Sequence, residues 1–212
     1  MVDVKICGLS TLESVDAAIE AGAALVGLVF FPRSPRNVSL QQAKMLADHA
    51  RGQAKIVALI VDADDVLLRE INAVVAPDLY QAHGSETPQR VTEIHKLTGK
   101  PVIKAIKVTD SSDIAKAADY TGKASLILYD AKAPETLVNA LPGGNGLAFD
   151  WTLLDGPNRT EGFILSGGLN PENVARAIRA TEASIVDVSS GVESAPEVSQ
   201  SDLSRTCGAF TS

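Results

Sequence analysis

The sequence predicts a single-domain (β/α)8 barrel, an α/β fold in which eight parallel strands alternate with helices. Eight short apolar segments recur, mostly about every 21 to 30 residues, which is the spacing of one strand–helix unit each. Patterns with helical spacing lie between most of these segments. The chain has 212 residues, of which 45% are hydrophobic, enough for one domain with a large core. We therefore expect residues 1–212 to form one barrel.

The expected strands are short and apolar. Residues 25–30 form a continuous apolar run, which suits a parallel strand buried on both faces. Residues 2–7 instead alternate between apolar and polar side chains and end at Cys7, followed by Gly8. In order, the expected strands are residues 2–7, 25–30, 56–60, 79–80, 102–106, 126–129, 162–165 and 185–188.

The expected helices follow most of these strands. In the first, Leu12, Val15 and Ile19 have helical spacing, and Glu13 lies near the start, where the helix dipole favours negative charge. The expected helices are residues 11–21, 40–50, 64–75, 87–97, 110–120, 171–180 and 198–209. Prolines and glycines interrupt the interval 131–151, and a loop of that length is usually functional or mobile.

A doubly wound open sheet is the alternative architecture. It usually has fewer strands, and it often carries a glycine-rich phosphate loop after its first strand. Here the first strand is followed by the single Gly8, and the chain contains no linker or low-complexity tract. These features favour the barrel.

Composition restricts the classes of partner. The net charge of -7 argues against nucleic acid and anionic membranes, since both favour basic surfaces. No apolar run reaches the roughly 20 residues that span a bilayer, so we expect a soluble, cytoplasmic protein. Cys7 and Cys207 lie at opposite ends of the chain without metal-ligand spacing, and we expect both to be reduced, although a bridge stays possible.

Two Ser-Gly segments indicate a phosphate site. In this fold the ligand lies at the C-terminal ends of the strands. Residues 166–168 follow the seventh expected strand and residues 189–191 follow the eighth, and glycines there let a phosphate approach backbone N–H groups. Residues 143–146 could add further donors. The alternative is that these glycines only form tight turns. The candidate residues in these segments are Gly144, Gly146, Gly167, Gly168, Ser190 and Gly191.

Cys7 and Asp130 are the candidate proton-transfer groups. They lie at the C-terminal ends of the first and sixth expected strands, so they should face each other across the mouth of the barrel, where one could remove a proton and the other donate one. Taken alone, Cys7 could be a buried core thiol and Asp130 an exposed loop carboxylate. Arg36 could hold a carboxylate through its planar donors. His83 could orient the site or cap a strand.

The strand ends as a set resemble the phosphoribosylanthranilate isomerase family of tryptophan biosynthesis. The similar segments occur in order along nearly the whole chain, and their ordered sum is specific although no single one is. They are Lys5-Ile6-Cys7-Gly8-Leu9, Ser34-Pro35-Arg36, Gln81-Ala82-His83-Gly84, Leu128-Tyr129-Asp130, Gly143-Gly144-Asn145-Gly146, Ser166-Gly167-Gly168-Leu169 and Asp187-Val188-Ser189-Ser190-Gly191.

The resemblance implies an Amadori rearrangement of N-(5'-phosphoribosyl)anthranilate. It implies Asp130 as the general acid, Cys7 as the general base and Arg36 as the partner of the anthranilate carboxylate, with Asp187 in a supporting role. His83 and the six serine and glycine candidates above would bind substrate. No metal or organic cofactor is expected, because the substrate's own amine supplies the electron sink. The expected partner is a small phosphorylated molecule, and the chain could be a monomer or a homodimer.

Departures and competing families leave alternatives open. Asn145 stands where the family usually has threonine, Ala82 replaces a bulky apolar residue, and residues 196–202 lack the family's glycine and lysine. The related histidine-pathway sugar isomerase uses two aspartates and an internally repeated half-barrel, and Cys7 argues against it. A non-catalytic barrel that only binds phosphate is the alternative from another functional class.

Overall fold

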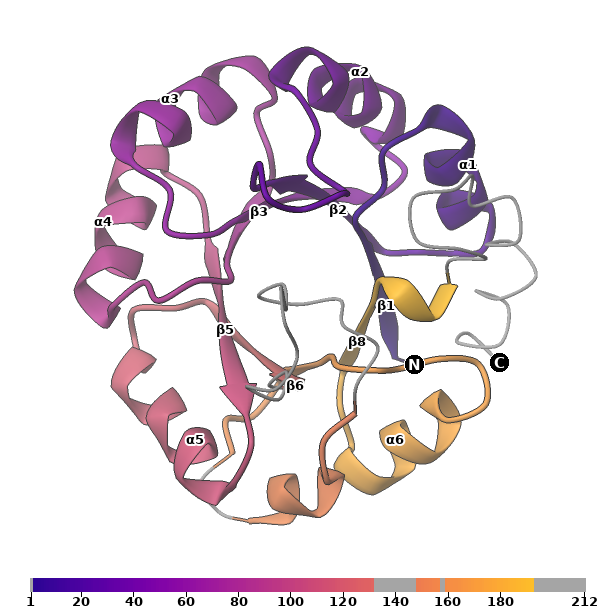
Figure 1. The fold of residues 1–212 in the computed structure, drawn as a ribbon, viewed down its shortest axis with the longest axis vertical. Helices are drawn as coiled ribbons and strands as arrows, with labels where there is room; N and C mark the ends of the chain where they lie inside the picture. The colour runs from indigo at the N-terminus through magenta and orange to yellow at the C-terminus, as the bar shows by residue number, and fades with distance from the viewer. Residues whose placement is uncertain (1, 132–147, 157–158, 193–212) are drawn as a thin grey trace.

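The structure is a computed structural model that describes residues 2–131, 148–156 and 159–192. Eight strands form a closed barrel in the order β1 to β8, and each pairs in parallel with its neighbours (Figure 1). This confirms the predicted fold class. The strands are β1 Asp3–Cys7, β2 Leu25–Phe30, β3 Lys55–Ile60, β4 Leu79–Ala82, β5 Val102–Val108, β6 Leu126–Ala131, β7 Ile164–Leu165 and β8 Ile185–Val188. That all of residues 1–212 belong to one domain stays a prediction.

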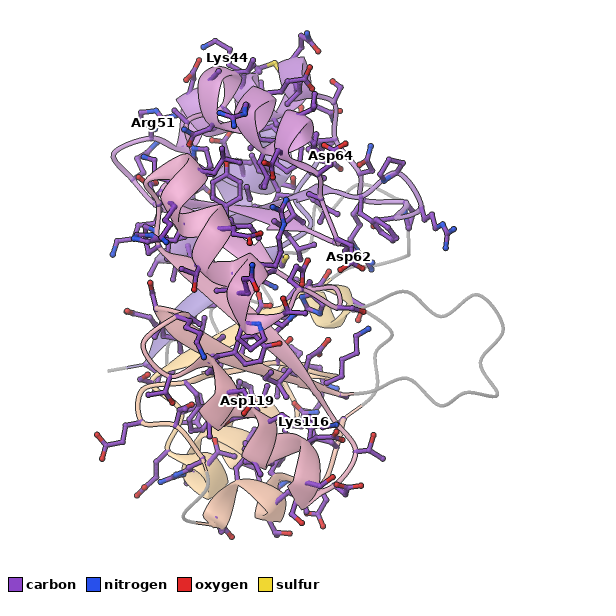
Figure 2. All side chains as sticks on the ribbon, turned by 90° about the vertical axis from the view of Figure 1, so that its left-hand side faces the viewer. Lys44, Arg51, Asp62, Asp64, Lys116 and Asp119 are labelled. Carbon is purple, nitrogen blue, oxygen red and sulfur yellow. The ribbon has the colours of Figure 1, made fainter. Side chains whose placement is uncertain are left out.

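The helices form a ring around the strands (Figure 1). They are α1 Leu12–Glu20, α2 Leu40–Ala50, α3 Asp65–Val74, α4 Pro88–Thr98, α5 Ser111–Ala115 and α6 Val174–Thr181, with short 3-10 helices η1 Lys116–Tyr120, η2 Trp151–Asp155 and η3 Ser190–Val192. Charged side chains such as Lys44, Arg51 and Lys116 lie on the outer surface of this ring (Figure 2). No helix within the described ranges is long and apolar enough to cross a membrane.

Two apolar layers explain why strands such as β2 are continuous apolar segments in the sequence. A small cluster fills the barrel interior, and it includes Leu25, Val57, Ile103 and Leu128. A much larger cluster fills the space between the strands and the helices. Because successive side chains of a strand point to opposite faces, each strand must supply apolar residues to both layers.

Side-chain caps fix the starts of the helices. Thr11 accepts a hydrogen bond from the backbone N–H of Ser14, whose hydroxyl accepts from Thr11 in return. Ser39, Asp64 and Thr87 cap α2, α3 and α4 in the same way. Helices α1 to α4 therefore begin within one residue of their predicted starts.

Several boundaries differ from the sequence predictions, and three of these differences affect the helix layer or the site. The segment 110–120 is divided into α5 and η1. The helix expected from residue 171 begins at Val174, because the side chains of Asn170 and Asn173 hold the preceding residues in a turn. Strand β6 extends to Ala131, so Asp130 belongs to the strand and not to the loop after it. The helix expected at residues 198–209 lies outside the described residues.

Candidate active site

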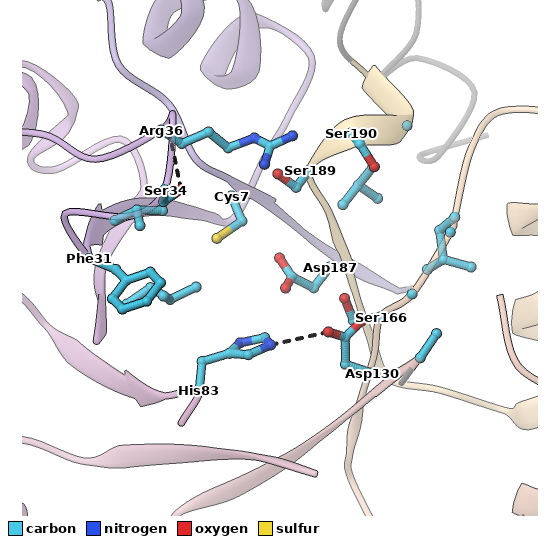
Figure 3. A pocket seen from close by; sticks show the side chains of 18 of the residues that line it. Cys7, Phe31, Ser34, Arg36, His83, Asp130, Ser166, Asp187, Ser189 and Ser190 are labelled. Carbon is cyan, nitrogen blue, oxygen red and sulfur yellow. Dashed lines mark hydrogen bonds and ion pairs between the residues drawn. The ribbon is translucent and has the colours of Figure 1, made fainter. Parts of the chain in front are cut away.

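A pocket lies at the C-terminal ends of the strands. It holds about 770 Å³ of space, part of it open to solvent, which falls within the range of small-molecule sites. Figure 3 shows its side chains. Its lining comes from seven of the eight strand ends and includes Cys7, Val29, Phe31, Ser34, Arg36, Leu59, Val61, His83, Asp130, Ser166, Gly167, Gly168, Leu169, Asp187, Ser189, Ser190 and Gly191.

Cys7 is the last residue of β1 and carries a free thiol that is 6% exposed. Lys5 lies two residues earlier on the same strand, so both side chains point to the barrel interior. The Lys5 Nζ donates to Asp187 Oδ1 on β8 over 2.8 Å, and the Lys5 side chain is fully buried. This ion pair joins β1 to β8 directly beneath the thiol.

Burial and the neighbouring charges together set the pKa of the Cys7 thiol, and the Asp187 charge adds to the effect of burial. Burial raises the pKa of the Cys7 thiol, and the neighbouring Lys5 charge and the Arg36 charge oppose that rise only in part. For Lys5, burial alone would lower the pKa, but the Asp187 carboxylate outweighs it and the pKa of Lys5 is raised. The ammonium therefore stays charged, and it is the nearest group able to stabilise a thiolate at Cys7.

Asp130 belongs to a buried chain of hydrogen bonds that runs from Gln81 through His83. Its Oδ2 lies 3.1 Å from His83 Nε2, and His83 Nδ1 lies 2.8 Å from Gln81 Nε2. Since the Gln81 amide nitrogen can only donate, Nδ1 accepts and the imidazole hydrogen lies on Nε2. That hydrogen is donated to Asp130 Oδ2, which leaves Oδ1 available to hold a proton.

One end of the pocket is apolar with a cation at its edge. Val29, Phe31 and Leu59 line it from the ends of β2 and β3. Arg36 lies in the turn after Phe31, where its backbone N–H donates to Ser34 Oγ over 3.2 Å (Figure 3). A flat aromatic ring carrying a carboxylate matches this combination of apolar wall and guanidinium.

The opposite end is built from the turns after β7 and β8. Gly167 has a φ of +91°, a backbone conformation that favours glycine. A Cβ at Gly191 would lie 1.8 Å from the backbone oxygen of Leu169, so only glycine lets the two turns pack this closely. Serines 166, 189 and 190 also line this end, which offers hydroxyl and backbone donors to an anion.

The structure brings most of the predicted site residues into this one pocket. Nine line it: Cys7, Arg36, His83, Asp130, Gly167, Gly168, Asp187, Ser190 and Gly191. Gly144, Gly146 and Cys207 lie outside the described residues. Two other strand-end residues, Asp62 and Lys107, are not part of the lining.

Sequence reasoning missed the apolar wall and the role of Gln81 beneath His83. An aromatic residue directly after a strand, as Phe31 is, was the available signal. In the described part of the chain, no group of three or more histidine, cysteine and acidic residues could hold a metal ion. That the protein needs neither metal nor cofactor stays a prediction.

The fold and the pocket together define a class, the (β/α)8 barrels that hold a small anionic ligand between ionisable groups at the strand ends. A family model described as N-(5'-phosphoribosyl)anthranilate (PRA) isomerase matches residues 4–203. The chain therefore belongs to the PRA isomerase family, which confirms the resemblance seen in the sequence.

Individual relatives agree with this assignment. The N-(5'-phosphoribosyl)anthranilate isomerase of Rhodopseudomonas palustris is 52% identical over 204 residues, covering 96% of this chain and 93% of the relative. That of Agrobacterium fabrum is 50% identical over 203 residues, covering 96% and 90%. The crystal structure of phosphoribosyl anthranilate isomerase from Thermotoga maritima superposes with a TM-score of 0.84 at 34% identity, covering 99% and 97%.

A further solved relative carries a ligand. It is phosphoribosyl anthranilate isomerase in complex with reduced 1-(o-carboxyphenylamino)-1-deoxyribulose 5-phosphate, and it superposes with a TM-score of 0.80 at 31% identity, covering 99% of this chain and 96% of the relative. That ligand combines a carboxyphenyl group with a sugar phosphate.

Proposed function

We propose that this protein isomerises N-(5'-phosphoribosyl)anthranilate to 1-(2-carboxyphenylamino)-1-deoxyribulose 5-phosphate in tryptophan biosynthesis, with Cys7 as general base and Asp130 as general acid. The family membership carries the reaction itself. The observation that carries the residue roles is that Cys7 and Asp130 line one pocket between an apolar, arginine-edged end and a serine- and glycine-rich end. A carboxyphenyl group and a phosphate joined by a sugar would place the sugar between these two residues.

The first step is proton donation to the ribose ring oxygen. The Oδ1 of protonated Asp130 gives its proton as the bond between that oxygen and C1' breaks, and the anthranilate nitrogen forms a double bond to C1'. The ring oxygen becomes a hydroxyl, and the product of this step is a protonated Schiff base. His83, which donates to the other oxygen of Asp130, stabilises the carboxylate that remains.

The second step is proton removal from C2'. The Cys7 thiolate takes this proton, and the bonding electrons move into the C1'–C2' bond while the nitrogen regains its lone pair. The enol-amine then becomes the aminoketone when its C2' hydroxyl loses a proton and C1' gains one. One proton must return from the Cys7 thiol to the Asp130 carboxylate before the next turnover.

The two ends of the pocket hold the substrate during these steps. Arg36 would pair with the carboxylate of the anthranilate ring, and Phe31, Val29 and Leu59 would contact the ring. The phosphate would accept hydrogen bonds from the backbone N–H groups and hydroxyls of the turns at Ser166–Gly168 and Ser189–Gly191. Because the substrate is held at both ends, its ribose stays close to Cys7 and Asp130.

The experiment is a fluorescence assay with N-(5'-phosphoribosyl)anthranilate. Purified protein should abolish the substrate fluorescence catalytically, and the Asp130→Asn variant should bind substrate but turn it over at least about 100-fold more slowly. Binding of the substrate by wild-type protein without turnover would instead indicate a non-catalytic phosphate-binding barrel.

Oligomeric state and cytoplasmic location stay predictions. Size-exclusion chromatography with light scattering distinguishes a monomer from a homodimer.

A further inference from the structure

A second buried ion pair lies outside the pocket, and the mechanism above does not use it. Lys104 on β5 and Glu86 in the segment before α4 are in contact over 2.8 Å, with side chains 3% and 1% exposed. Neither residue lines the pocket. Ile103 and Ala105 face the barrel interior, so Lys104 points to the helix layer, where it lies 5.9 Å from the ring centre of Tyr120.

All three hydrogens of the Lys104 ammonium are directed at one short segment. Besides Glu86, the Nζ donates to the backbone oxygen of Ala82 over 3.4 Å and to that of Gly84 over 2.7 Å. These are the residues immediately before and after His83. The ammonium therefore fixes the orientation of the Ala82–His83 and Gly84–Ser85 peptide groups.

The Glu86 carboxylate completes the same arrangement. Its Oε2 accepts from the backbone N–H of Gly84 over 2.9 Å, and its Oε1 accepts from the backbone N–H of Asp62 over 2.8 Å. The Asp62 carboxylate accepts in turn from the N–H of Ser85. The loop that carries His83 is thus held from one side by Lys104 and from the other by Glu86 and Asp62.

Stability alone is a weak reason for this pair. Burying two charges costs desolvation that their attraction repays only with good geometry, and an apolar pair of similar volume often serves as well. What an apolar pair cannot supply is a set of directional hydrogen bonds to the backbone of Ala82 and Gly84, the residues on either side of His83. His83 in turn contacts Asp130 over 3.1 Å.

We propose, on the basis of the function proposed above, that Lys104 and Glu86 are positioning residues that hold His83 against the general acid Asp130. Their effect reaches the reaction only through the His83 imidazole. Loss of the pair lets the His83 backbone rotate, so the imidazole no longer donates a well-aligned hydrogen bond to Asp130 Oδ2. Proton donation from Asp130 to the ribose oxygen then slows.

The test is a mutant cycle with His83. Lys104→Met with Glu86→Gln removes both charges together, so that neither is left buried alone, and the amide oxygen introduced at position 86 can still accept from the N–H of Gly84. The paired variant should lower kcat on the order of tenfold to a hundredfold with KM within about twofold. In a His83→Asn background the same two substitutions should change kcat by less than about twofold.

Tyr120→Phe is the matched control. Its hydroxyl donates to the backbone oxygen of Glu86 over 2.9 Å, so the variant disturbs the same region without touching the carbonyls that flank His83. We expect its kcat to stay within about twofold of wild type. If Tyr120→Phe slows turnover as much as the paired variant does, general loosening of the region explains the loss and the proposal is wrong.

Nitrogen-15 NMR of the imidazoles gives a readout that does not depend on turnover. The chain has three histidines, and the His83 signals are those missing from His83→Asn. Wild-type His83 should carry its hydrogen on Nε2, where it faces Asp130, whereas the paired variant should show a mixture of tautomers. Should the paired variant not fold, Glu86→Gln alone is measured in the same cycle and by the same spectra.

Each outcome decides between the two proposals. Equal kcat losses with and without His83, an effect on KM alone, or an unchanged His83 tautomer in the variant would overturn the positioning role. Wild-type protein without turnover would overturn the proposed function, while the NMR comparison would still decide whether Lys104 and Glu86 hold His83.

Discussion

In the proposed reaction, Cys7 would depend on its neighbour Lys5 to act as a base. An ordinary cysteine is only a few per cent ionised at neutral pH, and burial makes ionisation at Cys7 harder still. The Lys5 ammonium, held two residues away by Asp187, partly offsets that cost. The thiolate is therefore a minor, reactive form of the resting site, and its population should control the rate.

Replacing Cys7 with serine should nearly abolish turnover. A serine hydroxyl has a similar size but a far higher pKa, so we expect turnover to fall by about 10² to 10⁴ while the fold is unchanged. Fluorescence kinetics measure the first effect, and the midpoint of thermal unfolding measures the second. Turnover by Cys7→Ser close to that of wild type would remove Cys7 from the role of base.

The pKa shift of Cys7 predicts how the reactivity of its thiol depends on pH. Because burial raises the thiol pKa and the reactive form is the thiolate, the rate of Cys7 alkylation by iodoacetamide should increase with pH, by about tenfold per pH unit below that pKa, and level off above it. Alkylation rates measured by mass spectrometry across the neutral and alkaline range follow this increase. A rate that does not change with pH across the neutral range would contradict a raised thiol pKa.

Individual residues differ in how far the sequence could reveal them. Cys7 and Asp130 could be placed at the pocket because each stands at or directly after an expected strand, and Arg36 because it lies in the loop after another. Lys104 and Glu86 were not found, because their significance is the pairing of one side chain with carbonyls about twenty residues away. Such contacts follow from strand register, which the sequence does not state.

At the scale of elements, the turns after β7 and β8 act as one unit. Gly191 in η3 packs on the backbone of Leu169 in the neighbouring turn. The sequence predicted both turns from their Ser-Gly segments, since glycines after strands are a local signal. It did not predict the delayed start of α6 or the extra length of β6, because side-chain bonds at Asn170 and continued pairing with β5 decide these boundaries.

Gly191→Ala should weaken binding more than chemistry. Its new Cβ would overlap the backbone oxygen of Leu169, so η3 must move away and its donors would no longer point at the phosphate. A hydrogen bond to a charged group contributes about 1.5–3 kcal/mol, so KM should rise roughly tenfold or more while kcat changes less.

Steady-state kinetics of Gly191→Ala beside Gly156→Ala separate this effect from a general cost of adding a methyl group. A Cβ at Gly156 would have no atom within 4 Å, so that variant should behave as wild type. A lowered kcat with unchanged KM in Gly191→Ala would contradict a phosphate-binding role for the turn.

At the scale of the whole molecule, the barrel joins groups from both ends of the chain. The apolar end of the pocket comes from β2 and β3, the anion end from β7 and β8, and the Lys5–Asp187 pair connects β1 to β8. Because the protein has a net charge of -7, it would bind the proposed anionic substrate through local donors and Arg36, not through its overall field. Ligand binding should therefore stabilise the closed barrel as a whole.

The product analogue bound by the solved relative, reduced 1-(o-carboxyphenylamino)-1-deoxyribulose 5-phosphate, should raise the unfolding temperature. At a concentration about 100 times its Kd, a ligand that binds only the folded state adds about 2.7 kcal/mol, which corresponds to roughly 5–11 °C for a chain of this size. Differential scanning calorimetry with increasing analogue measures the shift.

Variants identify which contacts produce this stabilisation. Cys7→Ser should keep the full shift, because the thiol acts on the proton and contributes little to affinity. Arg36→Met should lose much of it at the same analogue concentration, because the carboxylate of the analogue loses its partner. Inorganic phosphate should give a smaller shift that is equal in wild type and Arg36→Met. An analogue shift that survives intact in Arg36→Met would place the carboxyphenyl group elsewhere in the pocket and reverse the orientation proposed for the substrate.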